Sequence, residues 1–137
     1  MTFWADGDEV VSHWEPSADF QGWTDTLHGG IQSTLIDEVA SWVVWYRLRT
    51  AGVTSRLTVS YRHPMMTNQG MITVRGRLRE MKRNIAIVEV TLSDAQGQEC
   101  TRAEVAYYTY PPERAAELFG FEPCLLVDSE NDPSFAP

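Results

Sequence analysis

Positive charge is scarce in this chain: 11 lysines and arginines stand against 19 aspartates and glutamates, for a formal net charge of −8. Proteins that hold nucleic acids by overall charge need a positive excess that neutralises phosphates. We therefore expect no nucleic-acid partner. A local basic site for a phosphorylated small molecule remains compatible with this composition.

Cysteine is scarce too. Cys100 and Cys124 are the two cysteines, and they lie too far apart for the usual spacing of metal ligands. A reducing compartment is the simple expectation for such a chain, so we expect a cytoplasmic protein. His13 and His63 have no nearby ligand residues in the sequence, and the chain predicts no metal site.

Long apolar runs are absent as well. The best candidate for a membrane span, around Trp42, is interrupted by Asp37, Glu38 and Arg47. The start, MTFWADGDEV, lacks the basic and apolar segments of a signal peptide. We find no internal repeat or low-complexity tract. The 137 residues therefore predict one domain with no membrane partner.

The chain does contain a regular series of strand patterns. Short runs at 2–4 and 9–14 flank Asp6-Gly7, which is a hairpin signal. Further on, apolar and polar residues alternate in four longer runs. Their core-facing positions are Leu57, Val59 and Tyr61; Ile72, Val74 and Leu78; Ala86, Val88, Val90 and Leu92; and Thr101, Ala103, Val105 and Tyr107. Turns at 81–84 and 94–97 predict an antiparallel meander.

One long helix is predicted between these two sets of strands, from about Gly30 to Thr50, with Gly52 as its stop. Its apolar residues form two adjacent stripes, which indicates burial against a sheet. The stripes are Ile31, Leu35, Val39, Trp42 and Tyr46, and Ile36, Ala40 and Val43.

A third face of this helix is small and polar: Gly30, Thr34, Asp37 and Ser41 follow helical spacing. A carboxylate among apolar neighbours costs free energy unless it is paired or has a chemical role. Asp37 is therefore the first candidate functional residue. The alternative is a structural carboxylate that is capped by backbone or paired with an arginine.

One helix cannot cover both faces of such a sheet, and the edges of the sheet would stay open. We therefore expect a homodimer, or a tetramer built from two dimers. The expected domain covers 1–111. Residues 112–137 would add a C-terminal helix near 113–119 and an extended, acidic tail.

Element order and motif together resemble the hot-dog fold, an α+β fold in which a curved antiparallel sheet wraps one central helix. The sequence His28-Gly29-Gly30, followed by Leu35-Ile36-Asp37-Glu38, resembles the HGG…LDE signature of acyl-CoA thioesterases of the phenylacetate-pathway type. The resemblance extends from about Gln21 to Tyr110. It implies hydrolysis of acyl-CoA thioesters to a free acid and CoA.

The resemblance also implies roles for single residues. Gly29 would stabilise the oxyanion through its backbone N–H, and Asp37 would act as nucleophile or as base for a water molecule. Thr54 would position that water, and His28 would fix the turn or act as a base. The site would lie at a subunit interface, and coenzyme A would enter only as part of the substrate, with no other cofactor.

The resemblance leaves the substrate-binding residues more open. Relatives carry an asparagine where this chain has Gly22, and Gln21 is the candidate replacement. Gly30, Thr34 and Ser41 would leave room for substrate. The candidates for holding the phosphates of coenzyme A are Arg56, Arg62, Lys82 and Arg83, with Arg75, Arg77 and Arg79 as a further basic strand face.

Two other functions stay open. A hot-dog dehydratase or hydratase would pair a histidine with an acid across the site. The loop Asp19-Phe20-Gln21-Gly22 has no histidine, which counts against that function. A non-catalytic acyl-CoA-binding protein would keep the fold without the chemistry. The Gly29 and Asp37 pair counts against it, whereas the missing asparagine keeps it open.

Overall fold

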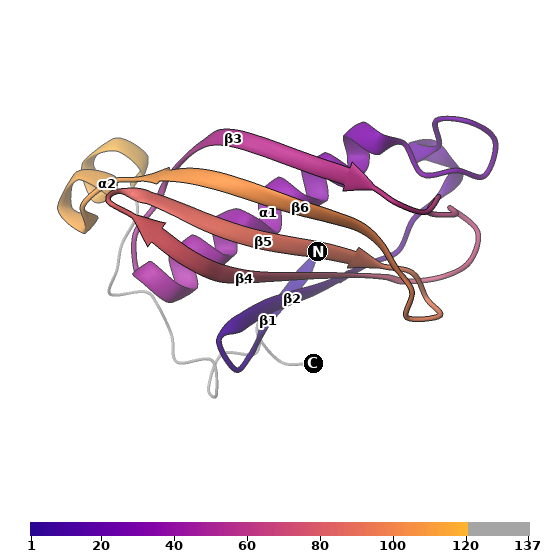
Figure 1. Ribbon diagram of the computed structural model, residues 1–137, viewed down its shortest axis with the longest axis horizontal. Helices are drawn as coiled ribbons and strands as arrows, with labels where there is room; N and C mark the ends of the chain where they lie inside the picture. The colour runs from indigo at the N-terminus through magenta and orange to yellow at the C-terminus, as the bar shows by residue number, and fades with distance from the viewer. Residues whose placement is uncertain (121–137) are drawn as a thin grey trace.

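The structure is a computed structural model, and it describes residues 1–120. An antiparallel sheet curves around one long helix, which is the predicted hot-dog fold (Figure 1). The strands are β1 (Thr2–Asp6), β2 (Glu9–Trp14), β3 (Gly52–Tyr61), β4 (Ile72–Lys82), β5 (Ile85–Ser93) and β6 (Glu99–Thr109), and the helices are α1 (Gly29–Leu48), α2 (Pro112–Phe119) and a short 3-10 helix, Ala18–Phe20.

The strand order is β1-β2-β4-β5-β6-β3, and every pairing is antiparallel. The prediction of a four-stranded meander after the helix is therefore wrong for its first strand. β2 occupies the side of β4 where β3 was expected, and β3 pairs with β6 instead. The connection from Tyr61 to Ile72 is long enough to carry the chain across the end of the sheet. β3 thus becomes an edge of the sheet, with no neighbouring strand on its other side among the described residues.

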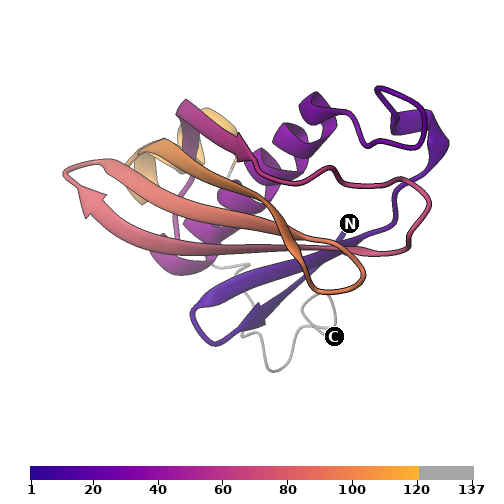
Figure 2. The same cartoon turned by 45° about the vertical axis from the view of Figure 1, so that its right-hand side comes forward.

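The core lies between α1 and the concave face of the sheet, a layering that Figure 2 shows from the side. The predicted inward positions of β4, β5 and β6 are buried, apart from a half-buried Leu78. Gly76 marks the closest approach of helix and sheet. A Cβ placed there would lie 2.8 Å from Val39 Cγ1 and 2.9 Å from Val43 Cγ2. A side chain at position 76 would push α1 away from the sheet.

The two ends of α1 differ in how well they were predicted. The N-terminus was expected at the glycine pair, and α1 begins at Gly29. The C-terminus is formed by Arg49, which adopts the left-handed conformation (φ 56°, ψ 38°) and donates its backbone N–H to the Trp45 carbonyl at 3.1 Å. Gly52 is therefore not the helix stop. It begins β3, where a Cβ would lie 1.8 Å from the Tyr108 carbonyl oxygen.

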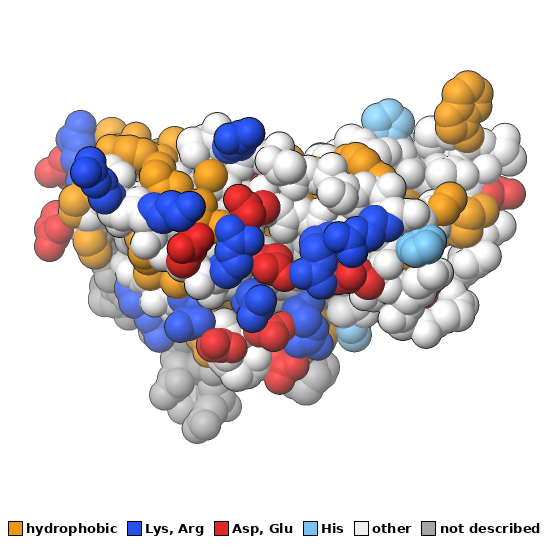
Figure 3. Space-filling model, in the orientation of Figure 1, with side chains coloured by type: hydrophobic (Ala, Val, Ile, Leu, Met, Phe, Trp, Pro, Cys, Tyr) orange, Lys and Arg blue, Asp and Glu red, His pale blue; other side chains and the backbone are white. Residues whose placement is uncertain are grey.

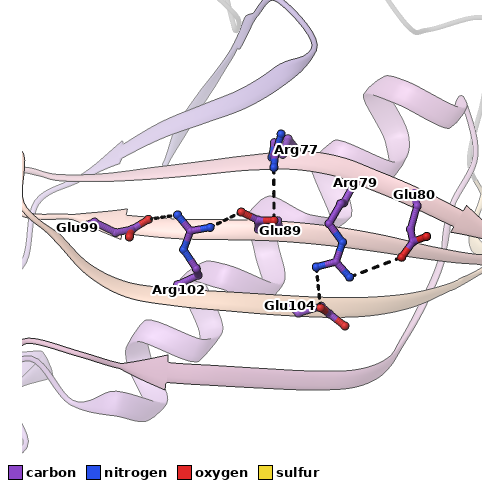
Figure 4. Close-up of polar contacts among 7 residues, drawn as sticks. All are labelled: Arg77, Arg79, Glu80, Glu89, Glu99, Arg102 and Glu104. Atoms are coloured by element: carbon purple, nitrogen blue, oxygen red, sulfur yellow. Dashed lines mark hydrogen bonds and ion pairs between the residues drawn. The ribbon is translucent and has the colours of Figure 1, made fainter.

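The outer face of the sheet carries charges of both signs over its central strands (Figure 3). Arg79 pairs with Glu104 at 2.8 Å, and Arg102 pairs with Glu89 and Glu99 (Figure 4). Arg75 contacts Asp6 at 2.7 Å and Glu9 at 3.1 Å, and Arg77 lies 3.5 Å from Glu89. Each of these arginines already contacts at least one carboxylate, which favours a solvated surface of ion pairs over a phosphate-binding role for this face.

α2 confirms the helix expected near 113–119, with Pro111 and Pro112 at its start and Gly120 at its end. The tail predicted beyond it lies outside the described residues. Within residues 1–120, no helix is both long and apolar enough to cross a membrane.

Candidate functional site

The first turn of α1 leaves one backbone donor without an acceptor. The His28 N–H donates to the Phe20 carbonyl at 2.9 Å, and the Gly30 N–H donates to His28 Nδ1 at 2.8 Å. Ile31 donates to the His28 carbonyl at 3.1 Å. Among the described residues, the Gly29 N–H has no acceptor. The free N–H and the positive end of the helix dipole therefore coincide at the residue predicted to stabilise the oxyanion.

The role of His28 follows from the same bonds. Its side chain caps the helix through Nδ1, as the structural interpretation of this residue predicted. That bond requires an unprotonated Nδ1, so the proton of the neutral ring lies on Nε2. The ring therefore fixes the turn, and Nδ1 is not free to accept a proton from a substrate or from water.

Tyr61, the last residue of β3, lies against the glycine pair. Its hydroxyl donates to the Gly29 carbonyl at 2.8 Å and lies 2.8 Å from Ser33 Oγ. A Cβ placed on Gly29 would lie 3.4 Å from three atoms of the phenol group. The sequence interpretation placed Tyr61 among the inward residues of its strand and assigned it no functional role. The signal in the sequence was its alternation with polar residues in step with Leu57 and Val59, which places the three side chains on one face of the strand.

A cavity of about 440 Å³ opens at this point, between the β2–α1 loop and the end of β3. Gly29, His28 and Tyr61 lie on its wall, together with Gly22, Trp23 and Arg62. Trp23 is 86% exposed, so a large apolar ring stands in solvent beside the cavity. The unpaired Gly29 N–H belongs to a residue that lines a space large enough for part of a small-molecule ligand.

Asp37 lies two turns further along α1 and is half-buried in the protomer. Its Oδ1 accepts a hydrogen bond from the Thr54 hydroxyl at 2.5 Å. Thr54 was predicted to lie near the start of the strand after the helix, and it does. The structure therefore brings Asp37 and Thr54 together. This hydrogen bond orients the carboxylate. Thr54 is itself fixed in a strand that pairs with β6, so its hydroxyl is a less mobile donor than a water molecule would be.

The polar helix face around Asp37 is open to the outside of the protomer. Gly30 and Thr34 are exposed, and Ser41 is half-buried. The Thr34 hydroxyl donates to the Gly30 carbonyl at 3.0 Å and the Ser41 hydroxyl to the Glu38 carbonyl at 2.7 Å, so both hydroxyls bond back to their own helix. In a single protomer this face is therefore accessible from outside.

A second cavity, of about 280 Å³, begins one turn beyond Asp37. Ser41 and Tyr107 line it, with Trp42, Trp45, Thr50 and Ala51. Burial raises the pKa of Tyr107, and the negative charges of Asp37 and Glu38 raise that pKa further. Both causes favour the neutral phenol over the phenolate.

The remaining predicted binding residues do not gather at one place. Gln21 Oε1 accepts from the Asp25 N–H at 3.1 Å and braces its own loop, and Gln21 does not line the 440 Å³ cavity. Arg62 lines that cavity and lies 3.8 Å from Glu99. Arg56 belongs to β3. Lys82 and Arg83 lie at the β4–β5 turn, at the opposite end of the sheet from the start of α1 (Figure 1).

One buried polar bridge was not expected. Gln32 is 4% exposed, accepts from the Thr101 hydroxyl at 2.5 Å and donates to the Leu27 carbonyl at 3.4 Å. It ties the first turn of α1 to β6 and to the preceding loop.

Over residues 1–120, no group of three His, Cys, Asp or Glu side chains could hold a metal ion.

Solved structures with this architecture share its fold at low sequence identity. A Streptococcus pneumoniae TIGR4 hypothetical thioesterase with coenzyme A has a TM-score of 0.71 and 20% identity, over 76% of this chain and 82% of that chain. A Streptococcus mutans UA159 protein bound to acetyl-CoA has a TM-score of 0.71 and 20% identity, over 82% and 91%. The zebrafish thioesterase superfamily member 2 has a TM-score of 0.66 and 19% identity, over 73% and 74%.

No curated protein matches this sequence significantly. The sequence profile of the thioesterase superfamily, however, matches residues 24–101. That segment begins in the loop before the glycine pair, contains α1 with Gly29 and Asp37, and ends in β6. By this match, which covers more than half of its length, the chain belongs to the thioesterase superfamily.

Proposed function

We propose that this protein hydrolyses acyl-CoA thioesters to a free acid and CoA. The observation that carries the proposal is the unpaired Gly29 N–H, at the positive end of α1 and on the wall of a cavity. A thioester carbonyl gains negative charge on its oxygen as it is attacked. A donor that is already oriented toward that oxygen stabilises the transition state more than the ground state.

Asp37 supplies the second chemical group. As a general base, its carboxylate removes a proton from a water molecule while the oxygen of that water attacks the carbonyl carbon. The tetrahedral intermediate then collapses, the C–S bond breaks, and the proton passes to the departing thiolate. As a nucleophile, Asp37 attacks the carbon itself, releases the thiolate and forms an anhydride that water hydrolyses. Both routes need an ionised, oriented carboxylate, and the Thr54 hydroxyl supports that orientation.

The two groups belong to different subunits in this proposal. Asp37 follows Gly29 by eight residues, which corresponds to about 12 Å along a helix axis. A carbonyl bonded to the Gly29 N–H would lie beyond the reach of Asp37 in the same chain. β3 is a ten-residue strand at the edge of the sheet. A second copy that pairs with this edge around a two-fold axis would bring the two polar helix faces together.

The substrate would then lie across the interface. We assign the thiol side of coenzyme A to the 440 Å³ cavity beside Gly29, where Arg62 is the nearest of the proposed phosphate-binding residues. The acyl group would reach toward the 280 Å³ cavity beside Asp37 of the other subunit. The structures of similar fold that contain coenzyme A or acetyl-CoA support this ligand class.

The test begins with a hydrolysis screen over short, long and aromatic acyl-CoAs. On the best substrate, Asp37→Asn should reduce turnover by about 10² to 10⁴, because it removes the base and nucleophile but keeps the size of the side chain. Glu38→Gln is the matched control. Glu38 is exposed and accepts from Trp42 Nε1 at 3.2 Å, so its change should cost far less. Wild-type turnover in the Asp37 variant would refute the assigned role.

The screen also separates hydrolysis from non-catalytic binding of acyl-CoA. If the wild-type protein binds acyl-CoA but hydrolyses none of the substrates, a non-catalytic binding protein becomes the better account. In that case CoA affinity should persist in Asp37→Asn, whereas turnover would be absent in both proteins.

A further inference from the structure

The peptide group between Gly29 and Gly30 is held at both of its polar ends. Its N–H, on Gly30, donates to His28 Nδ1 at 2.8 Å. Its carbonyl, on Gly29, accepts from the Tyr61 hydroxyl at 2.8 Å. The tyrosine has one hydroxyl proton and directs it at Gly29, so Ser33, at 2.8 Å, must be the donor in the contact between the two hydroxyls.

Two adjacent glycines would otherwise leave this turn loosely defined. Glycine has no Cβ and reaches backbone conformations that other residues avoid. The direction of the Gly29 N–H depends on the conformation of the backbone on both sides of it. A donor that must meet an oxyanion at 2.7 to 3.1 Å gains its advantage only if it is oriented beforehand.

The same strand also holds the other reactive group. Thr54, near the start of β3, donates to Asp37, and Tyr61, at the end of β3, donates to Gly29. Both side chains face the helix, and the phenol ring packs directly over Gly29. β3 therefore connects the carboxylate and the glycine turn of one chain through two hydroxyl groups.

We propose that Tyr61 is the positioning residue of the oxyanion site, an inference that rests on the proposed function. Its hydroxyl fixes the Gly29–Gly30 peptide, so that the neighbouring Gly29 N–H is directed toward the substrate before the substrate arrives. Ser33 supports this role by donating to the tyrosine oxygen and keeping its single proton directed at Gly29.

The test is Tyr61→Phe, which keeps the ring over Gly29 and removes only the hydroxyl. Turnover on the best acyl-CoA should fall by roughly 10- to 100-fold, the scale expected for a misplaced catalytic group. KM should change by less than about threefold, because ground-state binding does not depend on the oxyanion contact. Ser33→Ala leaves the bond from Tyr61 to Gly29 in place and should cost less than Tyr61→Phe.

Tyr46→Phe is the matched control, because the Tyr46 hydroxyl also donates to a glycine carbonyl, that of Gly7 at 3.0 Å, away from the site. Both variants lose one tyrosine–glycine hydrogen bond, and only the Tyr61 variant should lose turnover. Equal turnover in the two variants would overturn the proposal.

A second measurement does not depend on activity. The Gly30 amide reports directly on the held peptide, and its hydrogen exchange should accelerate by roughly fivefold in Tyr61→Phe, the factor for one hydrogen bond of ordinary net strength. It should not change in Tyr46→Phe. If turnover falls but Gly30 exchange does not, Tyr61 acts on the substrate itself and the positioning role is wrong. If the wild-type protein hydrolyses no thioester, the proposed function fails, and the exchange rates alone decide whether Tyr61 orders the turn.

Discussion

At the scale of single residues, the candidate site combines a free backbone N–H with a carboxylate, and a hydroxyl group of β3 holds the backbone next to the first and the side chain of the second. The Gly29 N–H is the donor that the first turn of α1 leaves unused, and its neighbouring peptide is held by His28 and Tyr61. The Asp37 carboxylate is held by Thr54. Such preorganisation is the main way in which a protein can favour charge that appears only during the reaction.

Gly29→Pro tests the backbone donor directly. Proline removes this N–H and is favoured at the first position of a helix. His28 already has the backbone conformation that a following proline requires (φ −60°, ψ 133°). The variant should keep its helix content by circular dichroism and lose about 10² to 10³ in turnover.

Gly29→Ala is the companion variant, because it adds one carbon and keeps the N–H. That carbon would lie 3.4 Å from the Tyr61 phenol, an ordinary contact. It should lose far less activity than the proline variant. Similar turnover in the two variants would mean that the Gly29 N–H does not stabilise the oxyanion.

The candidate roles of Gly29 and Thr54 came from the family resemblance, whereas Asp37 was also singled out by its place on the polar face of the helix, and His28 by its place at the turn that opens the helix. Tyr61 was missed. Its alternation with Leu57 and Val59 showed that it faces the helix, but its partner depends on how far β3 slides along α1. That offset is set by tertiary packing and leaves no local trace in the sequence.

At the scale of elements, α1 lies close to the sheet because of one glycine. Gly76, in β4, faces Val39 and Val43 at distances that leave no room for a methyl group. A glycine inside an alternating strand pattern is a signal of close backbone approach. Here it permits α1 to pack closely against β4.

Gly76→Ala should therefore destabilise the protein by about 1 to 3 kcal/mol through overpacking. Val43→Ala, which opens space at the same point, should cost less in the Gly76→Ala background than in the wild type. Urea unfolding of the four proteins at one fixed protein concentration measures this coupling. Strict additivity would show that position 76 does not limit the approach of α1.

The strands themselves were predictable because period-two patterns are local, whereas their order was not. The first strand of the expected meander pairs with β6 instead of β4, since β2 fills the place beside β4. Gly52 was wrongly interpreted as a helix stop because the reason for a glycine at this position lies far along the chain. The backbone of Tyr108, in β6, leaves no room for a side chain there. Long-range pairing decides both features, and a single sequence does not encode it locally.

At the scale of the whole molecule, residues 1–120 leave the β3 edge without a neighbouring strand and leave the polar helix face that contains Asp37 accessible. The two reactive groups lie too far apart along α1 to act on one carbonyl. The proposed dimer, which pairs the β3 edges, would account for all three features and would give two equivalent sites. Each site would combine Gly29 of one subunit with Asp37 of the other.

The central claim is that one site uses both subunits, and subunit complementation tests it most directly. Co-expression of Gly29→Pro and Asp37→Asn chains with different tags yields mixed dimers that can be purified through both tags. One site of a mixed dimer has both groups intact, and the other has neither. The account predicts that mixed dimers recover about half of the wild-type turnover, although both parents are inactive. Mixed dimers as inactive as their parents, or chains that never co-purify, would contradict it.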